Sequence, residues 1–418
     1  MPTYTAEWIL PISDEPIERG FVTIDSGRIA AVGDGIPQGA RPLGRVALLP
    51  ALVNAHTHLE LSYLRGRIAR RERFLDWIRD LMAARREFPD ASDPVIVDAA
   101  RRAIAYARAS GTGLFGDISN TLVTAPLLRD ARMPARVFYE LLGFNASDPE
   151  ARLKAARDQI ARAGLHGSDN AGVDLQTRPR AESADDIRVS LAPHAPYSVS
   201  PALFQAIRAD LDAHAGDISS VHLGESPEEV EFTRRGTGPW RAMLEDLGVW
   251  SDDWRAPGTS PVTYLSDLGF LDRCVLAVHG VQFDGEDLTR LGALGVTIVS
   301  CPRSNEYVGV GAPPLEAFYA MDVDVAFGTD SLASAPDLNV FSELKAARRL
   351  APRVPAARLL ESATLIGARA LGFGRDYGSI EAGKRASLIA VRVPEHVTDV
   401  QEYLVGGIEP DAIQWLDR

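Results

Sequence analysis

Two histidines separated by one residue stand directly after an apolar run. His56 and His58 follow residues 48–55, most of which are hydrophobic. Because side chains alternate along a strand, both imidazoles are expected on the same side of it. Neutral imidazole is the commonest metal ligand in proteins, so this pair at the end of a strand indicates a metal site.

The same pattern returns further along the chain, where three more histidines and one aspartate follow apolar runs. They are His194, His222, His279 and Asp330. One histidine in such a place is most often a hydrogen-bonded core residue. Its repetition at several strand ends favours a shared site, because catalytic groups of TIM barrels lie at the carboxyl ends of the strands. Three imidazoles and one carboxylate suit Zn²⁺ or Fe²⁺, which lower the pKa of bound water to about 7.

The number of metal ions can be judged from the lysines. A dinuclear site of this architecture usually carries a bridging carboxylated lysine on a middle strand. The chain has lysine only at Lys154, Lys345 and Lys384, and none of them is near the end of a predicted barrel strand. One metal ion per chain is therefore expected.

Glu225 is the candidate for proton transfer. It follows His222 by three residues, just beyond the predicted strand, and would stand beside the metal water. A carboxylate there can take a proton from water and give it to a ring nitrogen or a leaving amine. The alternative is that Glu225 caps the helix that begins near Pro227, since proline favours the first helical turn. Beside this histidine we favour the catalytic role.

Buried strands alternate with helical patterns through the middle of the chain, at residues 95–110, 149–163 and 227–235 for the helices. This alternation indicates parallel βα units, and eight of them fit an α/β fold of the TIM (β/α)8 barrel type. A doubly wound open sheet is the runner-up, but no GxGxxG motif follows a strand. The strand candidates are residues 46–49, 113–117, 135–140, 188–193, 218–222, 274–279, 296–300 and 323–328.

Both ends of the chain read as β-structure. Residues 21–32 look like a hairpin and residues 386–393 like a strand. An isolated hairpin is marginal, so the two ends are expected to build one small β-sandwich domain together. The predicted boundaries are 1–48 plus 376–418 for this domain and 49–375 for the metal-dependent catalytic barrel.

The composition limits the compartment and the partners. The 418 residues are 46% hydrophobic with a formal net charge of −13, which argues against nucleic-acid and membrane partners. Two cysteines exclude a disulfide framework, and residues 1–10 lack a basic segment, so a cytoplasmic protein with a small-molecule substrate is expected. Assembly into a homo-oligomer is left open. A polar stretch at residues 164–186 is expected to form a loop.

With these residues placed, the chain resembles the amidohydrolase superfamily. Within it, the chain looks like the mononuclear deaminase and chlorohydrolase group, which includes S-adenosylhomocysteine, methylthioadenosine and aminodeoxyfutalosine deaminases. The resemblance implies a TIM-barrel hydrolase that acts on carbon–nitrogen bonds other than peptide bonds. It rests on Pro-Ala-Leu-Val-Asn-Ala-His-Thr-His at 50–58, Leu-Arg-Gly at 64–66, Phe-Leu-Asp-Trp-Ile at 74–78, Pro-His-Ala-Pro-Tyr-Ser at 193–198, His-Leu-Gly-Glu at 222–225, His-Gly at 279–280, Ser-Cys-Pro-Arg-Ser-Asn at 300–305, Gly-Thr-Asp at 328–330 and Ala-Thr-Leu-Ile-Gly-Ala-Arg-Ala-Leu-Gly at 363–372.

The resemblance implies which of the candidates bind metal. His56, His58, His222 and Asp330 match the metal ligands, with Zn²⁺ favoured over Fe²⁺. Asp330 also matches a catalytic position.

The resemblance also implies roles around the metal. Glu225 matches the proton shuttle, and His279 matches a catalytic histidine that contacts the metal water. His194 and Asn305 match positions that commonly face the substrate. Trp77 is taken with them as a substrate contact, and packing is its alternative role.

The predicted activity is hydrolytic deamination of a nucleobase, nucleoside or related aromatic amine, with ammonia released through a metal-activated hydroxide. Residues 58–62 are most similar to aminodeoxyfutalosine deaminases. Leu61 stands where nucleoside deaminases often carry methionine, and the helix before Gly111 lacks a glutamate that some relatives use toward a ribose. The alternatives are a chlorohydrolase or a cyclic-amide amidohydrolase, and more remotely a non-catalytic scaffold. Glu225 favours deamination, because an amine leaving group needs a proton and chloride does not.

Overall fold

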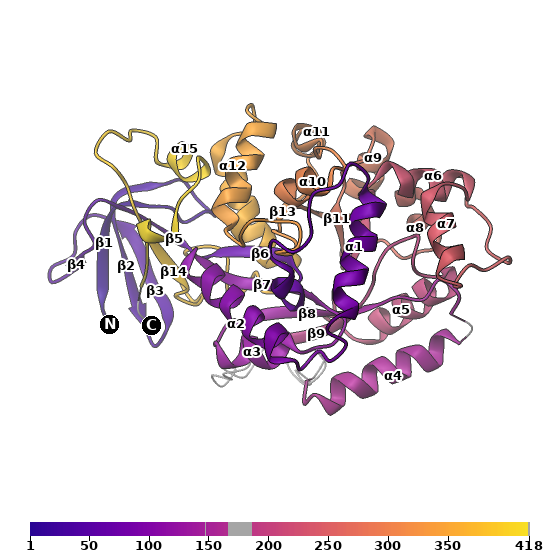
Figure 1. Ribbon diagram of the computed structural model, residues 1–418. Helices are drawn as coiled ribbons and strands as arrows, with labels where there is room; N and C mark the ends of the chain where they lie inside the picture. The colour runs from indigo at the N-terminus through magenta and orange to yellow at the C-terminus, as the bar shows by residue number, and fades with distance from the viewer. Residues whose placement is uncertain (147, 166–185, 417–418) are drawn as a thin grey trace.

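The computed structural model describes residues 1–146, 148–165 and 186–416, so most of the predicted loop at 164–186 lies outside the described residues. Figure 1 shows a sheet on the side where both termini lie, and a larger region of strands and helices beside it. The helices of the described residues are η1 (Leu59–Leu64), α1 (Phe74–Arg86), α2 (Pro94–Ala109), α3 (Thr124–Asp130), α4 (Pro149–Arg162), α5 (Pro201–Ala213), α6 (Pro227–Arg235), α7 (Pro239–Asp246), α8 (Pro261–Asp267), α9 (Gly285–Leu294), α10 (Pro302–Val308), α11 (Leu315–Ala320), α12 (Val340–Leu350), α13 (Ala356–Glu361), η3 (Ser362–Ile366), α14 (Gly367–Ala370), α15 (Val400–Val405) and η4 (Pro410–Ala412).

The larger region contains two parallel sheets of four strands each. Their strands follow the order of the chain, with a connection of one or more helices after most of them. The mixed α/β fold with parallel strands that the sequence predicts is therefore confirmed. The first sheet holds β6 (Leu52–Thr57), β7 (Thr112–Ser119), β8 (Ala135–Leu141) and β9 (Ile187–Pro193), and the second holds β10 (Ser219–Leu223), β11 (Val275–His279), β12 (Thr297–Ser300) and β13 (Val325–Phe327).

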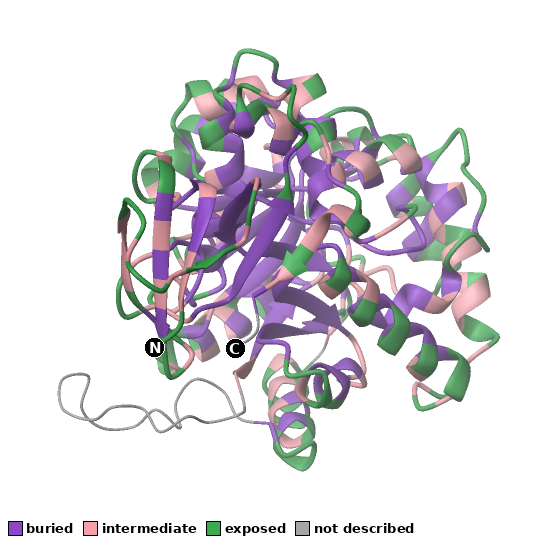
Figure 2. Cartoon of the chain, turned by 90° about the vertical axis from the view of Figure 1, so that its left-hand side faces the viewer, coloured by how far each residue is buried: buried purple, intermediate pink, exposed green. Residues whose placement is uncertain are grey.

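These strands are nearly continuous runs of buried residues, as expected of parallel strands that are covered on both faces. Figure 2 shows the buried strands at the centre and exposed residues on the outer helices. Local signals start the helices: the side chains of Ser200, Ser226 and Ser260 cap α5, α6 and α8, and a proline follows each cap.

Hydrogen bonds join the two parallel sheets at both of their edges. Between β6 and β13, the Asp330 N–H donates to the His56 carbonyl (3.0 Å), and the Asn54 amide donates to the Thr329 hydroxyl (2.8 Å). Between β9 and β10, the Ser219 hydroxyl donates to the Leu191 carbonyl (2.9 Å). These bonds place β6 beside the segment after β13, and β9 beside β10.

The strands of the two chain ends form a seven-stranded sheet. Its order is β15-β14-β5-β1-β2-β3, with β4 paired to β1. The C-terminal strand β14 pairs with β5 over five residues, which joins the two ends of the chain directly. A sandwich of two sheets and the domain boundaries stay predictions. The strands are β1 (Thr3–Ile9), β2 (Ile17–Asp25), β3 (Arg28–Asp34), β4 (Arg41–Pro42), β5 (Val46–Pro50), β14 (Leu388–Arg392) and β15 (Ile413–Trp415).

One of the eight strands predicted for the barrel belongs to the seven-stranded sheet instead. Residues 46–49 were expected to be the first barrel strand, but they form β5 of the seven-stranded sheet, and the strand that carries His56 is β6. The error has a physical reason. The apolar run extends through both strands, all of whose residues are buried, and periodicity cannot divide such a run. Among the described helices, none has both the length and the apolar character to cross a bilayer.

Candidate metal centre and active site

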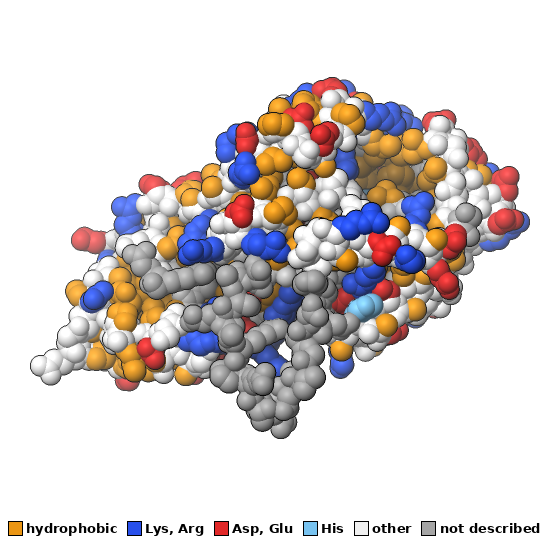
Figure 3. Space-filling model, turned by 90° about the horizontal axis from the view of Figure 1, so that it is seen from below, with side chains coloured by type: hydrophobic (Ala, Val, Ile, Leu, Met, Phe, Trp, Pro, Cys, Tyr) orange, Lys and Arg blue, Asp and Glu red, His pale blue; other side chains and the backbone are white. Residues whose placement is uncertain are grey.

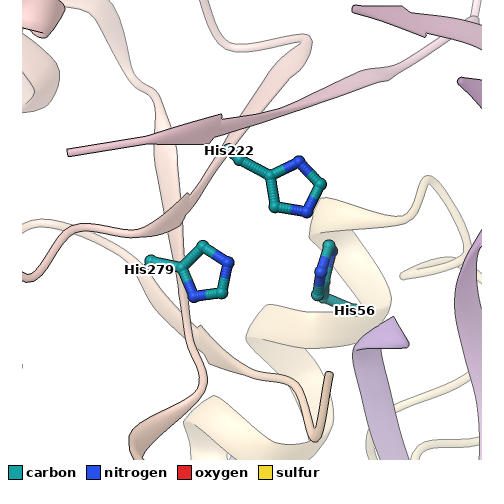
Figure 4. Close-up of side chains that lie close together, drawn as sticks. All are labelled: His56, His222 and His279. Carbon is teal, nitrogen blue, oxygen red and sulfur yellow. The ribbon is translucent and has the colours of Figure 1, made fainter. Parts of the chain in front are cut away.

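Five side chains from four strand ends converge at one point. His56 lies in β6, His58 follows that strand, His222 lies in β10, and His279 ends β11. The ring centroids of His56 and His58 are 5.0 Å apart, as are those of His56 and His222. Figure 4 shows the rings of His56, His222 and His279 turned toward one another. Asp330, just after β13, completes the group, so the sequence-predicted residues are brought together.

The donor atoms of this group are close enough to share one ion. The Nε2 atoms of His58 and His222 are 3.4 Å apart. Asp330 Oδ1 lies 3.5 Å from His58 Nε2 and 3.9 Å from His56 Nε2. Two sets of three have donor atoms within 4.8 Å of one another: His56, His58 and Asp330, and His56, His222 and His279. His56 belongs to both, which makes it the centre of the cluster.

The residues present fit a divalent metal ion. His56 is completely buried, and neither of its ring nitrogens has a hydrogen-bond partner among the described residues. Buried polar atoms without a partner are costly and rare in native proteins. Burial lowers the pKa of His58 to about 4 and that of His279 to about 3, so these rings are neutral and keep a lone pair. Neutral imidazoles and a carboxylate form the donor set that zinc and similar ions prefer.

Hydrogen bonds orient the candidate ligands. His222 Nδ1 donates to the carbonyl oxygen of His194 (3.0 Å), which leaves the Nε2 lone pair facing the cluster. The Ser304 hydroxyl donates to Asp330 Oδ2 (2.6 Å). Burial alone would raise the pKa of Asp330, but His58, His279 and the Ser304 hydroxyl lower it overall. Asp330 is thus held as a carboxylate.

The backbone is strained at two of these residues. His279 has a φ of 78° and Asp330 a φ of 57°, in the left-handed region that side chains other than glycine rarely adopt. At Gly328, a Cβ atom would lie 2.7 Å from the backbone oxygen of His56. Only glycine lets β13 approach β6 so closely. Strain of this kind persists where the surrounding structure enforces it, and it concentrates at functional sites.

Glu225 faces the cluster and does not cap α6. Its Oε1 lies 3.6 Å from His279 Nε2, and burial raises the pKa of Glu225 well above its ordinary value. The cap is Ser226, whose hydroxyl accepts from the Glu229 N–H (3.3 Å). The Glu229 carboxylate in turn accepts from the N–H groups of Gly224 and Glu225, both at 2.9 Å. Sequence reasoning missed Glu229, which fixes the loop that carries Glu225. Its spacing of four residues from Glu225 was the available signal.

Asn305 and Trp77 both have partners within the protein. The Asn305 side-chain amide donates to His279 Nδ1 (3.0 Å), and Asn305 is fully buried. It therefore holds the ring of the predicted catalytic histidine. Trp77 is 5% exposed and stacks on Phe74 in a hydrophobic cluster. Substrate contact by these two residues stays a prediction.

A cavity of about 570 Å³ adjoins the cluster. His194 lies on its wall, as predicted for a residue that faces the substrate, and its Nδ1 hydrogen-bonds to Ser198 (2.6 Å). Most of the wall is hydrophobic, and α1 and α7 contribute Ile78, Leu81, Met82, Trp240, Met243 and Leu244 to it. Figure 3 shows a hollow with hydrophobic side chains in the half of the molecule away from the termini.

Glu140 and Asn120 give the cavity a polar side next to the histidines. Glu140, the last residue but one of β8, places Oε1 3.6 Å from His222 Nδ1. Asn120 donates to Glu140 Oε2 (2.9 Å) and accepts from Arg85 (3.1 Å). The sequence did not indicate these two residues. Arg85 does not follow a predicted strand. Asn120 does follow one, but its side chain is not a usual metal ligand.

Comparison with known proteins connects this geometry with a family. The model described as "Amidohydrolase family" matches residues 47–408. A 5-methylthioadenosine/S-adenosylhomocysteine deaminase of Moorella thermoacetica is 30% identical over 401 residues, which cover 92% of this chain and 83% of the relative. An aminodeoxyfutalosine deaminase of Deinococcus radiodurans is 31% identical over 371 residues, or 84% of this chain and 81% of the relative.

A solved structure has the same fold. The crystal structure of an adenosine deaminase from Xanthomonas campestris, described with bound zinc, superposes with a TM-score of 0.79. It is 29% identical, and the superposition covers 98% of this chain and 90% of that one. The similarity extends over the candidate centre and the terminal sheet alike.

Proposed function

This chain belongs to the amidohydrolase family, and on that premise we propose that it is a metal-dependent hydrolytic deaminase of a nucleobase, nucleoside or related aromatic amine. The observation that carries the proposal is the buried Glu225 carboxyl against His279. It lies beside a cluster in which the two ring nitrogens of His56 have no partner within the described part of the chain. A proton shuttle next to a metal cluster is what the release of ammonia requires.

We infer that the two four-stranded sheets are halves of one (β/α)8 barrel over residues 49–375. The hydrogen bonds at both sheet edges support this closure. Residues 1–48 and 376–418 are proposed as the small β-domain, supported by the pairing of β14 with β5. In a barrel the active site is built at the carboxyl ends of the strands, where the histidines lie.

We propose one metal ion per chain, held by His56, His58, His222 and Asp330, with Zn²⁺ favoured over Fe²⁺. When bound, such an ion supplies a Lewis acid that lowers the pKa of water to about 7. Elemental analysis of the purified protein is expected to give one equivalent. Two equivalents would contradict the mononuclear assignment.

The chain's own residues account for the proton transfers. Glu225 takes a proton from the attacking water and passes it to the ring nitrogen beside the carbon that bears the amine. It then takes the proton of the hydroxyl group now on that carbon and delivers it to the amine, so that the carbonyl forms as the C–N bond breaks and ammonia leaves. Asn305 donates to His279 Nδ1, so the Nε2 of this ring carries its proton and points it toward the reacting oxygen. Asp330, kept ionised by its neighbours, stabilises the charge that forms there.

The cavity favours a substrate with an apolar substituent over a bare nucleobase. About 570 Å³ exceeds what a nucleobase fills, and the wall is mainly hydrophobic. Arg85, Arg86 and Arg152 also lie on this wall, so a carboxylate on the substituent would be accommodated. Among the named relatives' substrates, we favour one like aminodeoxyfutalosine. His194 is proposed to contact the substrate, and Trp77 to support the wall from behind.

The test is an ammonia-release screen of metal-loaded protein. The panel holds aminodeoxyfutalosine, S-adenosylhomocysteine, methylthioadenosine, adenosine, adenine and a pterin, with a chlorotriazine and a cyclic amide as the alternative chemistries. We expect ammonia from a substituted nucleoside and metal-dependent turnover. Chloride release or ring opening without any ammonia would refute the deaminase assignment.

A further inference from the structure

A second cavity, of about 310 Å³, lies between η1, α2 and the segment after β13. It shares no lining residue with the cavity beside the metal cluster. Its polar lining consists of two arginines, two tyrosines and a serine: Arg65, Arg102, Tyr63, Tyr106 and Ser62. It contains no acidic lining residue, so its charge is positive.

The two arginines are not neutralised by an ion pair. Among the described residues, neither Arg65 nor Arg102 has an ion-pair partner. Arg101, one residue before Arg102 in α2, behaves differently and pairs with Asp98 at 3.1 Å. Many surface arginines of this chain have such a carboxylate, and these two face a cavity instead.

The acidic groups near this cavity do not cancel its charge. Burial, Asp337 and Glu409 raise the pKa of Tyr106, and Arg65 lowers it. Asp337 is already paired with Arg303 at 2.9 Å. The two guanidinium groups are the only charged groups among the residues that line the cavity.

Ser62 adds an independent sign of a missing partner. Its side chain is 5% exposed, and within the described part of the chain its Oγ has no hydrogen bond. A buried hydroxyl without a partner destabilises the fold unless a group in the cavity accepts a hydrogen bond from it. An acceptor placed between this hydroxyl and the guanidinium groups would satisfy all of them.

We propose that this cavity binds the phosphate group of a small molecule. Guanidinium groups bind phosphate through paired, charge-assisted hydrogen bonds, and hydroxyl donors complete the shell of a tetrahedral anion. The rest of the wall suits the carbon part of such a ligand. Val95, which is 46% exposed, and the side chains of Ala99 and Leu332 line it. The site is distinct from the one proposed for deamination, and it does not depend on that function.

The test is equilibrium dialysis of the metal-loaded protein with radiolabelled inorganic phosphate at constant ionic strength. The variants are Arg102→Gln and Ser62→Ala, with Arg101→Gln as the matched control on the same helix. We expect one equivalent of phosphate to bind. Arg102→Gln should raise Kd about tenfold or more, the loss of a hydrogen bond to a charged group, and Ser62→Ala should raise it less. Arg101→Gln should bind as the unchanged protein does.

Two competitors define the ligand. Phenyl phosphate should displace phosphate at lower concentration than inorganic phosphate does, because the ring would cover Val95 and Leu332. Malonate should compete poorly. Unaltered phosphate binding in Arg102→Gln would overturn the proposal, because the phosphate would then lie elsewhere, for example at the metal. An absence of phosphate binding would overturn it as well. Displacement by malonate as strong as by phenyl phosphate would overturn the phosphate assignment.

Discussion

Among the described residues, four sets of three histidine or carboxylate side chains have donor atoms within 4.8 Å of one another. Three of these sets contain His56 or His222 and lie at or beside the central cluster, and the fourth lies apart at the end of α5. The two places differ in what surrounds the donor atoms. The central cluster consists of His56, His58, His222, His279 and Asp330, at the ends of parallel strands. The helix cluster consists of Asp210, His214 and Asp217, in and after α5. By the spacing of donor atoms alone, either could hold a metal.

The helix cluster already contains a cation. Arg157 Nε donates to Asp210 (3.0 Å), and its Nη2 donates to Asp217 (3.1 Å). His214 Nδ1 donates to the backbone carbonyl of Asp210 (2.7 Å). In the central cluster, by contrast, the ring nitrogens of His56 have no partner among the described residues. Donor spacing is therefore not enough. In a metal site the donor atoms lack a protein cation and hydrogen-bond partners, whereas in an ion-pair network they have both.

The largest effect is expected from His56→Ala. Because His56 belongs to both three-residue sets of the central cluster, its loss should remove the metal and lower kcat/KM at least about 10³-fold, since a metal supplies several kcal/mol of transition-state stabilisation. Metal analysis and turnover are measured together. His214→Ala is the control from the helix cluster. A His56→Ala protein with a full equivalent of metal would remove the distinction between the clusters.

Glu225→Gln should separate metal binding from turnover. Glutamine has the shape of glutamate but cannot carry a proton, so kcat should fall about 10²–10⁴-fold with metal content unchanged. Glu231→Gln, in the helix α6 that follows Glu225 and hydrogen-bonded to Thr237, should have native kcat. A near-native rate for Glu225→Gln would show that the carboxyl serves only the structure.

Substitutions of two neighbouring residues of α10 should affect different properties, metal affinity in one case and kcat in the other. Ser304 donates to Asp330 and Asn305 to His279, so Ser304→Ala should weaken metal binding and Asn305→Ala should lower kcat in fully loaded protein. Each loss should be about 10–100-fold, as for other residues that orient a ligand or catalytic group. Metal titration and the dependence of kcat on pH distinguish them. An Asn305→Ala effect confined to KM would instead support direct substrate contact.

The smallest effect on activity is expected in the helix cluster. Arg157→Gln removes the cation paired with Asp210 and one of the two arginines near Asp217, the other being Arg136 at 3.9 Å. The free energy of unfolding should therefore fall by about 1–3 kcal/mol, as measured by denaturant titration. Metal content and kcat should stay native, and His214→Asn should change neither. Loss of metal in either variant would mean that the helix cluster contributes to metal binding.

The sequence by itself determined the features that depend on local order. Alternation along a strand places His56 and His58 together, and the spacing of three residues brings Glu225 near His222. The runs of buried residues predict the parallel strands, and the ordered motifs predict the family, which the match over residues 47–408 confirms. Each of these patterns lies within one strand and the turn after it. The boundary between β5 and β6 could not be predicted, because one apolar run contains both strands although they belong to two different sheets.

Only the tertiary structure decided which partner each side chain has. Asn305 holds His279 from 26 residues away, Glu60 accepts from Ser119 across 59 residues, and Arg157 meets Asp217 across 60. These contacts come from the order and register of the strands, which neither composition nor spacing encodes locally. For the same reason the sequence could not show that the helix cluster is neutralised by an arginine and that the central cluster is not. Whether a histidine can bind a metal depends on burial and on neighbouring charges, and only the folded chain supplies both.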